Sequence, residues 1–396
     1  MNMQTNVVRK SLDAVLGLLI MGVLVVYNAL RRLFSRRHRT SLARLQVDNI
    51  LVIKLCCLGD GVLALPAIRA LKQAYPQARL TVVCTPRNVD AFLGQDFIDE
   101  LVALRLTGLG GMREMLTGAI PAFRQALVAI RRCRPDIAVD LDLYYKITPI
   151  LAFLSGAPIR AGFDTAGKHR GYLYTHKAPR EPDRHELLCF LDILRPLGVR
   201  TDDKSLFLWR DPQAAARVAD ILLQSNIPPG GRYAVLSPGS SKNWPVKRWH
   251  ADRFAQVSNY LAEHFDLPTI IVGAPFEAEL GRHIAEAAGP PAINLAGKTT
   301  VRETIELLRG AAVVVSNDSG PMHLAAAVGA PVVAVFGPTN PNKWRPWGER
   351  TRVITSSACP HAPCYYLSAM PRCDAAECLG TIHVSQVTAA LDELLC

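Results

Sequence analysis

The chain has 396 residues, of which 49% are hydrophobic and 20% charged, and its formal net charge is +11. This length exceeds that of most single domains, so we expect two domains, each with its own core. Most of the surplus charge lies in residues 1–44, which hold eight basic residues and one acid. The rest of the chain is only mildly basic, which argues against a nucleic-acid-binding protein.

An uncharged run of 17 residues, 14–30, lies inside this basic segment and is followed by an arginine cluster that begins at Arg31. A membrane-spanning helix needs about 20 apolar residues, so the run is either a short spanning helix or a helix lying on anionic headgroups. The arginines argue against a third alternative, a buried core helix. The positive-inside rule then places the rest of the chain in the cytoplasm. We expect residues 1–45 to form a membrane-anchor helix with a basic flank.

From Gln46 onward, short apolar runs typical of buried parallel strands alternate with longer runs typical of helices. In the first half, the expected strands are 49–55, 79–84, 101–106 and 136–142, and the expected helices are 61–76, 120–133 and 185–198. A Pro/Gly-rich turn at 227–232 follows. Beyond it, the expected strands are 233–239, 269–274, 292–297, 312–318 and 331–337, and the expected helices are 246–265, 276–289, 300–311 and 320–329. The alternation predicts two doubly wound α/β domains, residues 46–226 and residues 232–396.

Ligands in such sheets bind beyond the carboxyl ends of the strands, so we expect a cleft between the domains that is lined by the loops following strands. The first such loop, CLGDG at residues 57–61, lacks the G-x-G-x-x-G pattern, and a dinucleotide cofactor is therefore not expected. Asp60 in this loop either caps the following helix or acts as a general base facing the cleft.

The loop SPGSSKNWPVKRW, residues 237–249, has the composition of an anion site. The backbone amides of its small residues, including Ser240 and Ser241, can face a phosphate together with the positive end of the next helix. Lys242 adds a full charge at the same point. We expect the side chains of Lys247 and Arg248 to be solvated.

The stretch NDSGPMH, residues 317–323, ends another expected strand with Asp318, whose carboxylate can accept hydrogen bonds from sugar hydroxyls. The free amides of the helix start at Ser319 and Gly320 predict a second anion or hydroxyl site. His323, one turn inside the helix, is either a packed core side chain or part of this site. Glu277, after another strand, either holds a ribose diol or is a solvated acid at a helix start.

Several of these motifs resemble those of one glycosyltransferase family. They are LGD at 58–60, K-x-W-P at 242–245, GAP-x-E at 273–277, and DSGPMHLAAA at 318–327 followed by GPT at 337–339. Over roughly residues 49–339 the chain resembles the heptosyltransferase family. The resemblance implies the GT-B fold, with two Rossmann-like domains facing across a cleft, and an inverting, metal-independent transferase that needs no cofactor.

The resemblance also implies a role for each matching residue. Asp60 would be the base that deprotonates the acceptor hydroxyl. The donor's phosphates would be bound by Lys242, Ser240, Ser241, Ser319 and Gly320. The donor's nucleoside and sugar would be bound by Glu277, Asp318 and His323.

The implied donor is a nucleotide sugar, ADP-heptose, and the implied acceptor is a lipid-linked saccharide of the lipopolysaccharide core, with no nucleic acid as partner. The basic N-terminal segment would hold the enzyme at the cytoplasmic face of the inner membrane. Two alternatives stay open: a GT-B transferase that uses another sugar nucleotide for a cell-envelope glycan, and a non-catalytic sugar-nucleotide-binding protein. The presence of both Asp60 and Lys242 argues against the second.

Ten cysteines fall into two groups and a terminal residue. The five from Cys56 to Cys189 lie in apolar, core-like sequence and are expected to be free thiols. Near the C-terminus a C-x4-C-x8-C-x4-C pattern is formed by Cys359, Cys364, Cys373 and Cys378. Four thiolates can form a structural zinc site, although these spacings are wider than the usual ones. Free thiols or disulfides are the alternative, and a cytoplasmic location disfavours disulfides.

Overall fold

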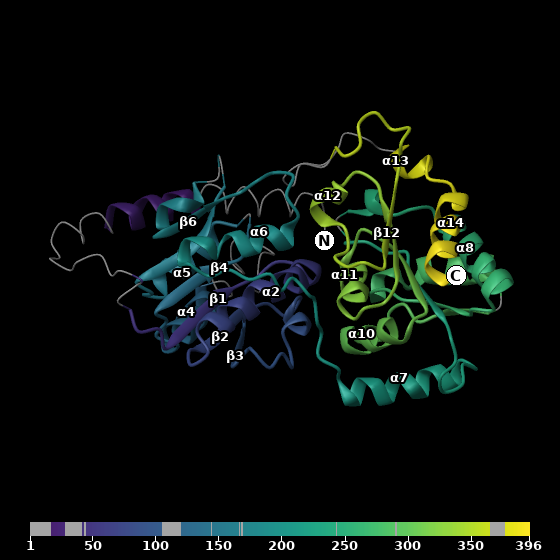
Figure 1. Ribbon diagram of the computed structural model, residues 1–396, viewed down its shortest axis with the longest axis horizontal. Coiled ribbons are helices and arrows are strands. Elements are labelled where there is room, and N and C mark those ends of the chain that lie inside the picture. Colours follow the sequence, from purple (N-terminus) through teal and green to yellow (C-terminus); the bar gives the residue numbers. More distant parts are fainter. Residues whose placement is uncertain are drawn as a thin grey trace. The chain divides into compact units, whose positions relative to one another are not determined.

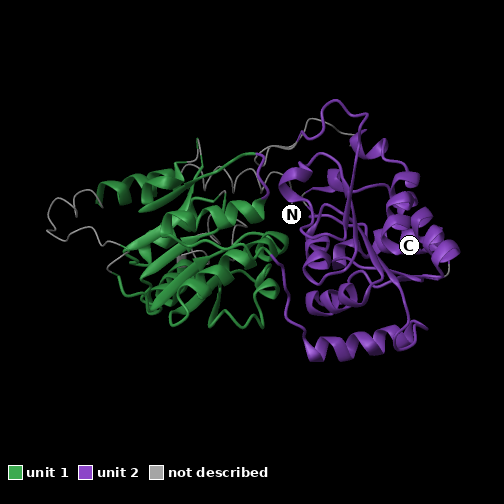
Figure 2. Cartoon of the chain, in the orientation of Figure 1, with its two compact units in different colours: residues 1–182, 186–204 green, residues 183–185, 205–396 purple. Residues whose placement is uncertain are grey.

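The chain divides into two units, each built on its own parallel sheet. The computed structural model describes residues 17–27, 42, 45–104, 120–143, 145–165, 167, 169–242, 244–289, 291–364 and 377–396 (Figure 1). Unit 1 comprises residues 1–182 and 186–204, and unit 2 comprises residues 183–185 and 205–396 (Figure 2).

Unit 1 contains a six-stranded sheet in the order β3-β2-β1-β4-β5-β6, and all its pairs are parallel. Its strands are β1 (Asn49–Ile53), β2 (Arg79–Cys84), β3 (Glu100–Ala103), β4 (Ile137–Asp140), β5 (Ile159–Asp164) and β6 (His176–Pro179). Its helices are α2 (Leu58–Ala74), α4 (Ile120–Arg132), α5 (Ile147–Leu154) and α6 (Glu186–Asp192). The central strands are apolar on both faces because helices cover both sides of such a sheet: Leu51 and Val52 of β1 point to opposite faces and are both fully buried.

Unit 2 contains a second six-stranded parallel sheet, in the order β12-β11-β10-β7-β8-β9. Its strands are β7 (Ala234–Ser237), β8 (Thr269–Ile271), β9 (Ala292–Asn294), β10 (Val313–Asn317), β11 (Val332–Phe336) and β12 (Thr351–Thr355). Its helices are α7 (Pro212–Gln224), α8 (Ala251–Phe265), α9 (Ala278–Ala288), α10 (Val301–Gly310), α11 (Gly320–Ala327), α12 (Pro341–Trp344), α13 (Glu377–Gly380) and α14 (Val384–Leu395).

The two sheets repeat one topology. Numbered within its own unit, each sheet has the strand order 3-2-1-4-5-6 of a Rossmann domain, so the doubly wound α/β prediction is confirmed. In this order the strand order reverses between the first and fourth strands, which is called the switch point of the sheet. Ligands bind there, in the crevice at the carboxyl ends of these two strands. These positions are the ends of β1 and β4 in unit 1 and of β7 and β10 in unit 2.

The division between the units falls at residues 204/205, earlier in the chain than the expected turn at 227–232. Helix α7 therefore belongs to unit 2. Its partner there is α10: the backbone amide of Asp211, the N-cap of α7, donates to Glu306, and Arg217 pairs with Glu303 at 2.7 Å. Both glutamates are buried, so these charges fix α7 against unit 2.

Residues 17–27 of the expected membrane anchor form a helix, and the rest of the run at 14–30 and its arginine flank lie outside the described residues. Met21 is buried against Ile150 and Leu173 of unit 1. The helix also has exposed large apolar side chains: Leu18, Leu19, Ile20, Val23, Val26 and Tyr27. Within the described part of the chain, no helix is both long and apolar enough to cross a membrane.

A buried ionic network in unit 1 links Arg170 to the residues at the end of β4. Arg170 is fully buried and its guanidinium lies 2.8 Å from the Asp140 carboxylate at the end of β4. The same guanidinium donates to the Asp142 carbonyl at 2.8 Å, and the Tyr174 hydroxyl donates to Asp140. Desolvating two charges is costly, so removal of one partner leaves the other buried without compensation.

We therefore expect Arg170→Met to lower the free energy of unfolding by about 3–5 kcal/mol, because it leaves the Asp140 carboxylate buried and unpaired. Urea unfolding followed by circular dichroism measures this change. The matched control is Arg79→Met, whose exposed pair with Glu100 should contribute less than about 1 kcal/mol. Equal effects of the two substitutions would contradict the argument.

Candidate active site

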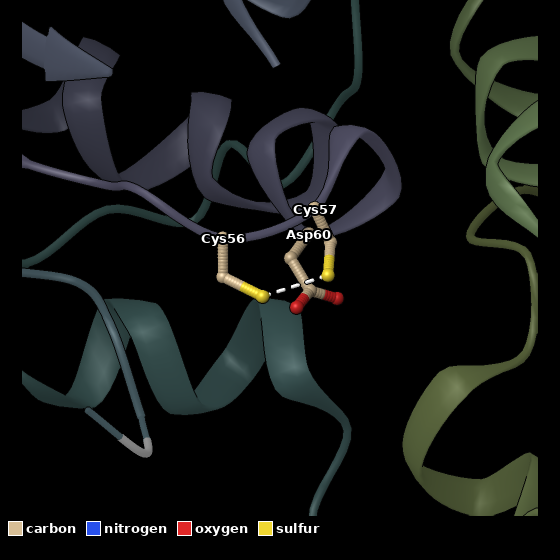
Figure 3. A group of neighbouring side chains, drawn as sticks. All are labelled: Cys56, Cys57 and Asp60. Atoms are coloured by element: carbon tan, nitrogen blue, oxygen red, sulfur yellow. Dashed lines mark hydrogen bonds between the residues drawn. The ribbon is translucent and has the colours of Figure 1, made fainter. Parts of the chain in front are cut away.

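Asp60 lies at the switch point of unit 1, in the first turn of α2 directly after β1. The turn into the helix passes through Cys57, whose φ of 46° is unusual for a residue other than glycine. The Cys57 carbonyl accepts a hydrogen bond from the Gly61 amide at 3.0 Å and thereby starts the helix. The Asp60 side chain is 19% exposed and lies beside the two neighbouring thiols (Figure 3). It does not cap the helix, because the N-cap is Cys57.

A buried lysine, Lys54, connects Asp60 to the end of β4. Its ammonium lies 3.2 Å from Asp142 and 4.0 Å from Asp60, and it is also 5.0 Å from the ring centroid of Phe190. The Asp142 carboxylate also accepts the backbone amides of Leu55, at 2.5 Å, and of Cys56, at 3.2 Å. The loop after β1 is therefore fixed to the loop after β4 by a carboxylate that belongs to the second loop.

Lys54 stays charged in this environment. Burial opposes the charged form, but the carboxylates of Asp142 and Asp60 outweigh it and raise the pKa of Lys54 above its usual value. An ammonium about 4 Å away favours the ionised form of a carboxylate, which is the form that can accept a proton.

In unit 2, the loop after β7 is held by Glu277. One carboxylate oxygen accepts the Ser240 amide at 2.9 Å, and the other accepts the Ala274 amide at 2.8 Å. Glu277 is buried rather than solvated, and burial raises its pKa despite these bonds and the nearby Arg248. Its carboxylate lies so close to Gly239 that a Cβ there would be 2.1 Å from Oε1. Position 239 therefore requires glycine.

Lys247 and Arg248 are not simply solvated, which corrects the sequence-based expectation. The Lys247 ammonium donates to the Asp318 carboxylate at 2.7 Å, and both side chains are mostly buried. The Arg248 guanidinium donates to the Ser240 hydroxyl at 3.2 Å and lies 3.7 Å from Glu277. The 3-10 helix Pro245–Lys247 precedes α8, so these residues lie on the loop and not within the long helix that the sequence predicts.

The remaining phosphate-site candidates lie on the same loop and at the start of α11. Ser241 and Lys242 are exposed, and the Lys242 ammonium is 6.0 Å from the ring centroid of Phe276. Ser319 is the N-cap of α11, and its side chain makes no capping bond to the helix amides. Gly320 is the first residue of that helix. Anions are favoured at such a helix start because its amides are unpaired and its dipole is positive.

Asp318 and His323 are both buried beside this helix start. Burial is the main cause that lowers the pKa of His323 to about 4, and Asp318 opposes it. His185 and the ammonium of Lys247 also lower the pKa of His323. The Nδ1 atom of His323 has no hydrogen-bond partner among the described residues, which is unusual for a buried nitrogen. The His185 ring is itself buried and bonds to the Arg345 carbonyl at 2.9 Å.

Three of the four cysteines of the C-terminal pattern are described by the structure. Cys359 and Cys364 are half-buried, Cys378 is buried in α13, and Cys373 lies outside the described residues. Within the described part of the chain, the only group of three or more potential metal ligands is Cys56, Cys57 and Asp60 in unit 1. The zinc site in the tail stays a prediction.

Comparison with known proteins identifies the family. The model of "Glycosyltransferase family 9 (heptosyltransferase)" matches residues 123–370, more than half of the chain. The chain belongs to glycosyltransferase family 9. It is therefore a glycosyltransferase, as its motifs predict.

Curated relatives of this family 9 chain span most of its length. A "Lipopolysaccharide heptosyltransferase 3" of Escherichia coli is 26% identical over 298 residues, covering 74% of this chain and 84% of that protein. A "Lipooligosaccharide heptosyltransferase 2" of Campylobacter jejuni is 32% identical over 303 residues, covering 75% and 83%.

Solved structures share the two-unit fold. A family 9 glycosyltransferase from Veillonella parvula superposes with a TM-score of 0.72 at 24% identity, covering 89% of this chain and 98% of that one. The E. coli heptosyltransferase WaaC with ADP superposes with a TM-score of 0.65 at 20% identity, covering 87% and 99%. These matches confirm the predicted GT-B class of fold.

Several residues that build this family 9 site belong to none of the family motifs recognised in the sequence. Lys54 is one: its signal is a lysine that interrupts the apolar run NILVIKL. Asp142 is another, in the acid-rich end of the strand DIAVDLD. Asn317 is a third, and its side chain joins the β7 and β10 loops through bonds to the Pro238 carbonyl, at 2.7 Å, and the Trp249 amide, at 3.1 Å.

Because the pKa of His323 is lowered to about 4 from its ordinary 6.5, the unfolded chain binds more protons than the folded chain between these values. The contribution of His323 to stability is complete above pH 6.5 and is lost as the pH falls toward 4. We expect the full contribution of His323 to the free energy of unfolding to be on the order of 3 kcal/mol.

Urea unfolding at pH 7 and pH 4.5 tests this prediction. The free energy of unfolding should fall less between the two pH values for His323→Gln than for the unmodified chain. An identical fall would show that His323 does not titrate as its burial requires.

Proposed function

We propose that this family 9 enzyme transfers a heptose from ADP-heptose to a saccharide acceptor of the lipopolysaccharide core. One observation carries the proposal: the switch point of unit 1 holds a carboxylate, and the switch point of unit 2 holds positively charged groups. Asp60, a carboxylate suited to accept a proton, follows β1 of unit 1. Cationic side chains and free helix amides follow β7 and β10 of unit 2. The curated relatives are named as lipopolysaccharide or lipooligosaccharide heptosyltransferases, which supports the donor and acceptor class.

The donor would be held by unit 2. Its diphosphate would contact Lys242 and the loop at Ser240 and Ser241, together with the amides of Ser319 and Gly320. An ammonium and helix-start amides suit a phosphate, since neither requires the planar geometry of a carboxylate. WaaC, which shares this fold, has been solved with ADP and with ADP-2-deoxy-2-fluoro heptose.

The sugar and nucleoside would be bound beside this loop. Asp318 would accept hydrogen bonds from heptose hydroxyls, and the unpartnered Nδ1 of His323 is suited to another. Glu277 already accepts two backbone amides, but a carboxylate has about four acceptor positions, so it can still bind a ribose hydroxyl.

The proposed reaction is inverting. Asp60 removes the proton from the acceptor hydroxyl while the oxygen attacks the anomeric carbon from the face opposite the diphosphate. The C–O bond to the diphosphate breaks, and Lys242 with the helix amides stabilises the negative charge that develops on the leaving group. These positive groups take the part that a metal ion would otherwise take, so we propose a metal-independent reaction.

The acceptor class also fits a membrane surface. The helix at 17–27 exposes six large apolar side chains, and the adjoining sequence is rich in arginine. An apolar helix face next to cationic side chains binds anionic bilayers. We propose that this segment attaches the enzyme to the cytoplasmic face of the inner membrane, where it meets a lipid-linked acceptor.

Asp60→Asn tests the proposed base. It keeps the size of the side chain but cannot accept the proton, so we expect the transfer rate to fall by about 10²–10⁴-fold. The rate is measured as heptose addition to a heptose-deficient core lipopolysaccharide. The ADP-heptose dissociation constant, measured by calorimetry, should change little.

Glu100→Gln is the matched control, because it removes an exposed carboxylate of unit 1 away from the β1 loop. Near-normal turnover of Asp60→Asn would refute the assignment of the base. Failure of the unmodified enzyme with ADP-heptose, and success with another sugar nucleotide, would support the alternative donor.

Lys242→Ala tests the proposed phosphate contact. Loss of a charged partner costs about 1.5–3 kcal/mol, so the ADP-heptose dissociation constant should rise by roughly tenfold or more. Arg282→Ala, on the exposed side of α9, is the matched control and should leave donor binding unchanged. The metal-independent mechanism is tested with the unmodified enzyme, whose turnover should persist in EDTA. Loss of turnover in EDTA, restored by a divalent ion, would overturn this mechanism.

A further inference from the structure

Two adjacent thiols lie beside the proposed base and have no role in the proposed reaction. The sulfur atoms of Cys56 and Cys57 are 2.7 Å apart, and each lies within 4.8 Å of an Asp60 carboxylate oxygen. Both side chains point to the same side of the chain at the start of α2, with the Asp60 carboxylate next to them (Figure 3). Cys57 is exposed, in contrast to the core-like setting that its sequence suggests, and Cys56 is partly buried.

We propose that Cys56 and Cys57 are a redox-modification site: a peroxide oxidises the pair to a vicinal disulfide beside Asp60, which reversibly inactivates the enzyme. The effect on activity rests on the proposed role of Asp60, whereas formation of the disulfide does not.

The geometry favours a bond between these sulfur atoms over other uses of the pair. A disulfide needs a separation of about 2.05 Å, so the sulfurs have to approach by less than an ångström. A metal ion held by the same thiols and Asp60 would meet the ammonium of Lys54, which lies 4.0 Å from the Asp60 carboxylate. That buried positive charge disfavours a cation and does not oppose a neutral disulfide.

The two thiols have different accessibility, which assigns their roles. The exposed Cys57 is the sulfur that meets the oxidant, because redox-sensitive cysteines are accessible and lie next to a resolving cysteine. Cys56 resolves the product. Its hydrogen bond with Cys57 and its burial raise the pKa of Cys56, which keeps it a thiol until Cys57 has reacted.

The steps balance with hydrogen peroxide as the oxidant. The Cys57 thiolate attacks one peroxide oxygen, the O–O bond breaks, and a sulfenic acid and hydroxide form. The Cys56 sulfur then attacks the Cys57 sulfur, the S–O bond breaks, and the oxygen leaves as water. In total, two thiols and one peroxide give one disulfide and two waters, and the two thiol protons end in water.

The product is expected to be easily reduced. Neighbouring residues joined by a trans peptide have Cα atoms about 3.8 Å apart, which is shorter than the roughly 4.4–6.8 Å usual for a disulfide. The Cys56–Cys57 peptide is not among the cis bonds of the described chain. A bond outside the usual geometry is strained and therefore labile, as regulatory disulfides are.

Closing the disulfide would disturb Asp60 through the backbone. The Cys57 carbonyl starts α2 through its bond to the Gly61 amide, and the Cys56 amide is held by Asp142. A disulfide ring that joins the two side chains changes the backbone torsions of Cys56 and Cys57, between the amide held by Asp142 and the carbonyl that starts α2. A displacement of about 1 Å at a reacting group costs on the order of 10²-fold in rate.

Disulfide formation can be tested by peptide mapping, because trypsin releases the two cysteines on one peptide. Trypsin cleaves after Lys54 and Arg69, and the peptide 55–69 contains Cys56 and Cys57 and no other cysteine. After treatment of the full-length enzyme with hydrogen peroxide and alkylation of remaining thiols, this peptide should be lighter by two hydrogens and unalkylated. Transfer activity should fall by about 10²-fold and return with dithiothreitol.

The variants Cys56→Ser and Cys57→Ser should keep basal activity within about twofold and lose the reversible inactivation, since the disulfide cannot form. Cys133→Ser, which removes a partly buried thiol elsewhere in unit 1, should stay as sensitive as the unmodified enzyme. A doubly alkylated 55–69 peptide after oxidation, or a sulfinic acid in its place, would overturn the modification site. A disulfide in this peptide with full activity would refute the inactivation and not the site. Inactivity of the enzyme before oxidation would instead count against the proposed function.

Discussion

The buried ammonium of Lys54 lies between the carboxylates of Asp60 and Asp142 in unit 1. A lysine at the end of a buried strand is costly to desolvate, and this one is stabilised by Asp142 at 3.2 Å and Asp60 at 4.0 Å. Asp142 in turn accepts two backbone amides of the β1 loop, and the side chains of Thr85 and Asn88, after β2, donate to carbonyls of the same loop. The loop that leads from β1 into the first turn of α2, where Asp60 lies, is therefore held by side chains that follow both neighbouring strands.

Unit 2 repeats the topology and joins its two loops through an amide side chain and through an ion pair. Asn317 connects the β7 and β10 loops through its amide, and Glu277 binds the β7 loop through backbone amides. The Lys247 ammonium pairs with Asp318, and the Arg248 guanidinium bonds to the Ser240 hydroxyl and lies 3.7 Å from Glu277. In the proposed reaction, a bound diphosphate would compete with these acids for the two cations.

The sequence predicts the sheets well because their central strands are continuous apolar runs between turn residues. It misses β5, β6 and β12, whose sequences are short or mixed, as edge and near-edge strands often are. The positions of Asp60 and Asp318 follow from the rule that ligands bind at strand ends. Their partners do not, because Lys54–Asp142 and Lys247–Asp318 join residues separated by 88 and 71 positions. Only the fold shows that these charges meet.

The position of Lys54 also limits how the proposed base can act. A carboxylate beside an ammonium is a weak base, and an alcohol does not give up its proton to it before reaction. The hydroxyl becomes acidic only as its oxygen begins to bond to the anomeric carbon. In the proposed reaction, proton transfer to Asp60 would therefore accompany bond formation, and the charge on the departing diphosphate would have to be stabilised at the same moment. The proposed roles of the unit 2 cations and of the unit 1 carboxylate thus belong to a single chemical step, and the removal of either group should slow that step.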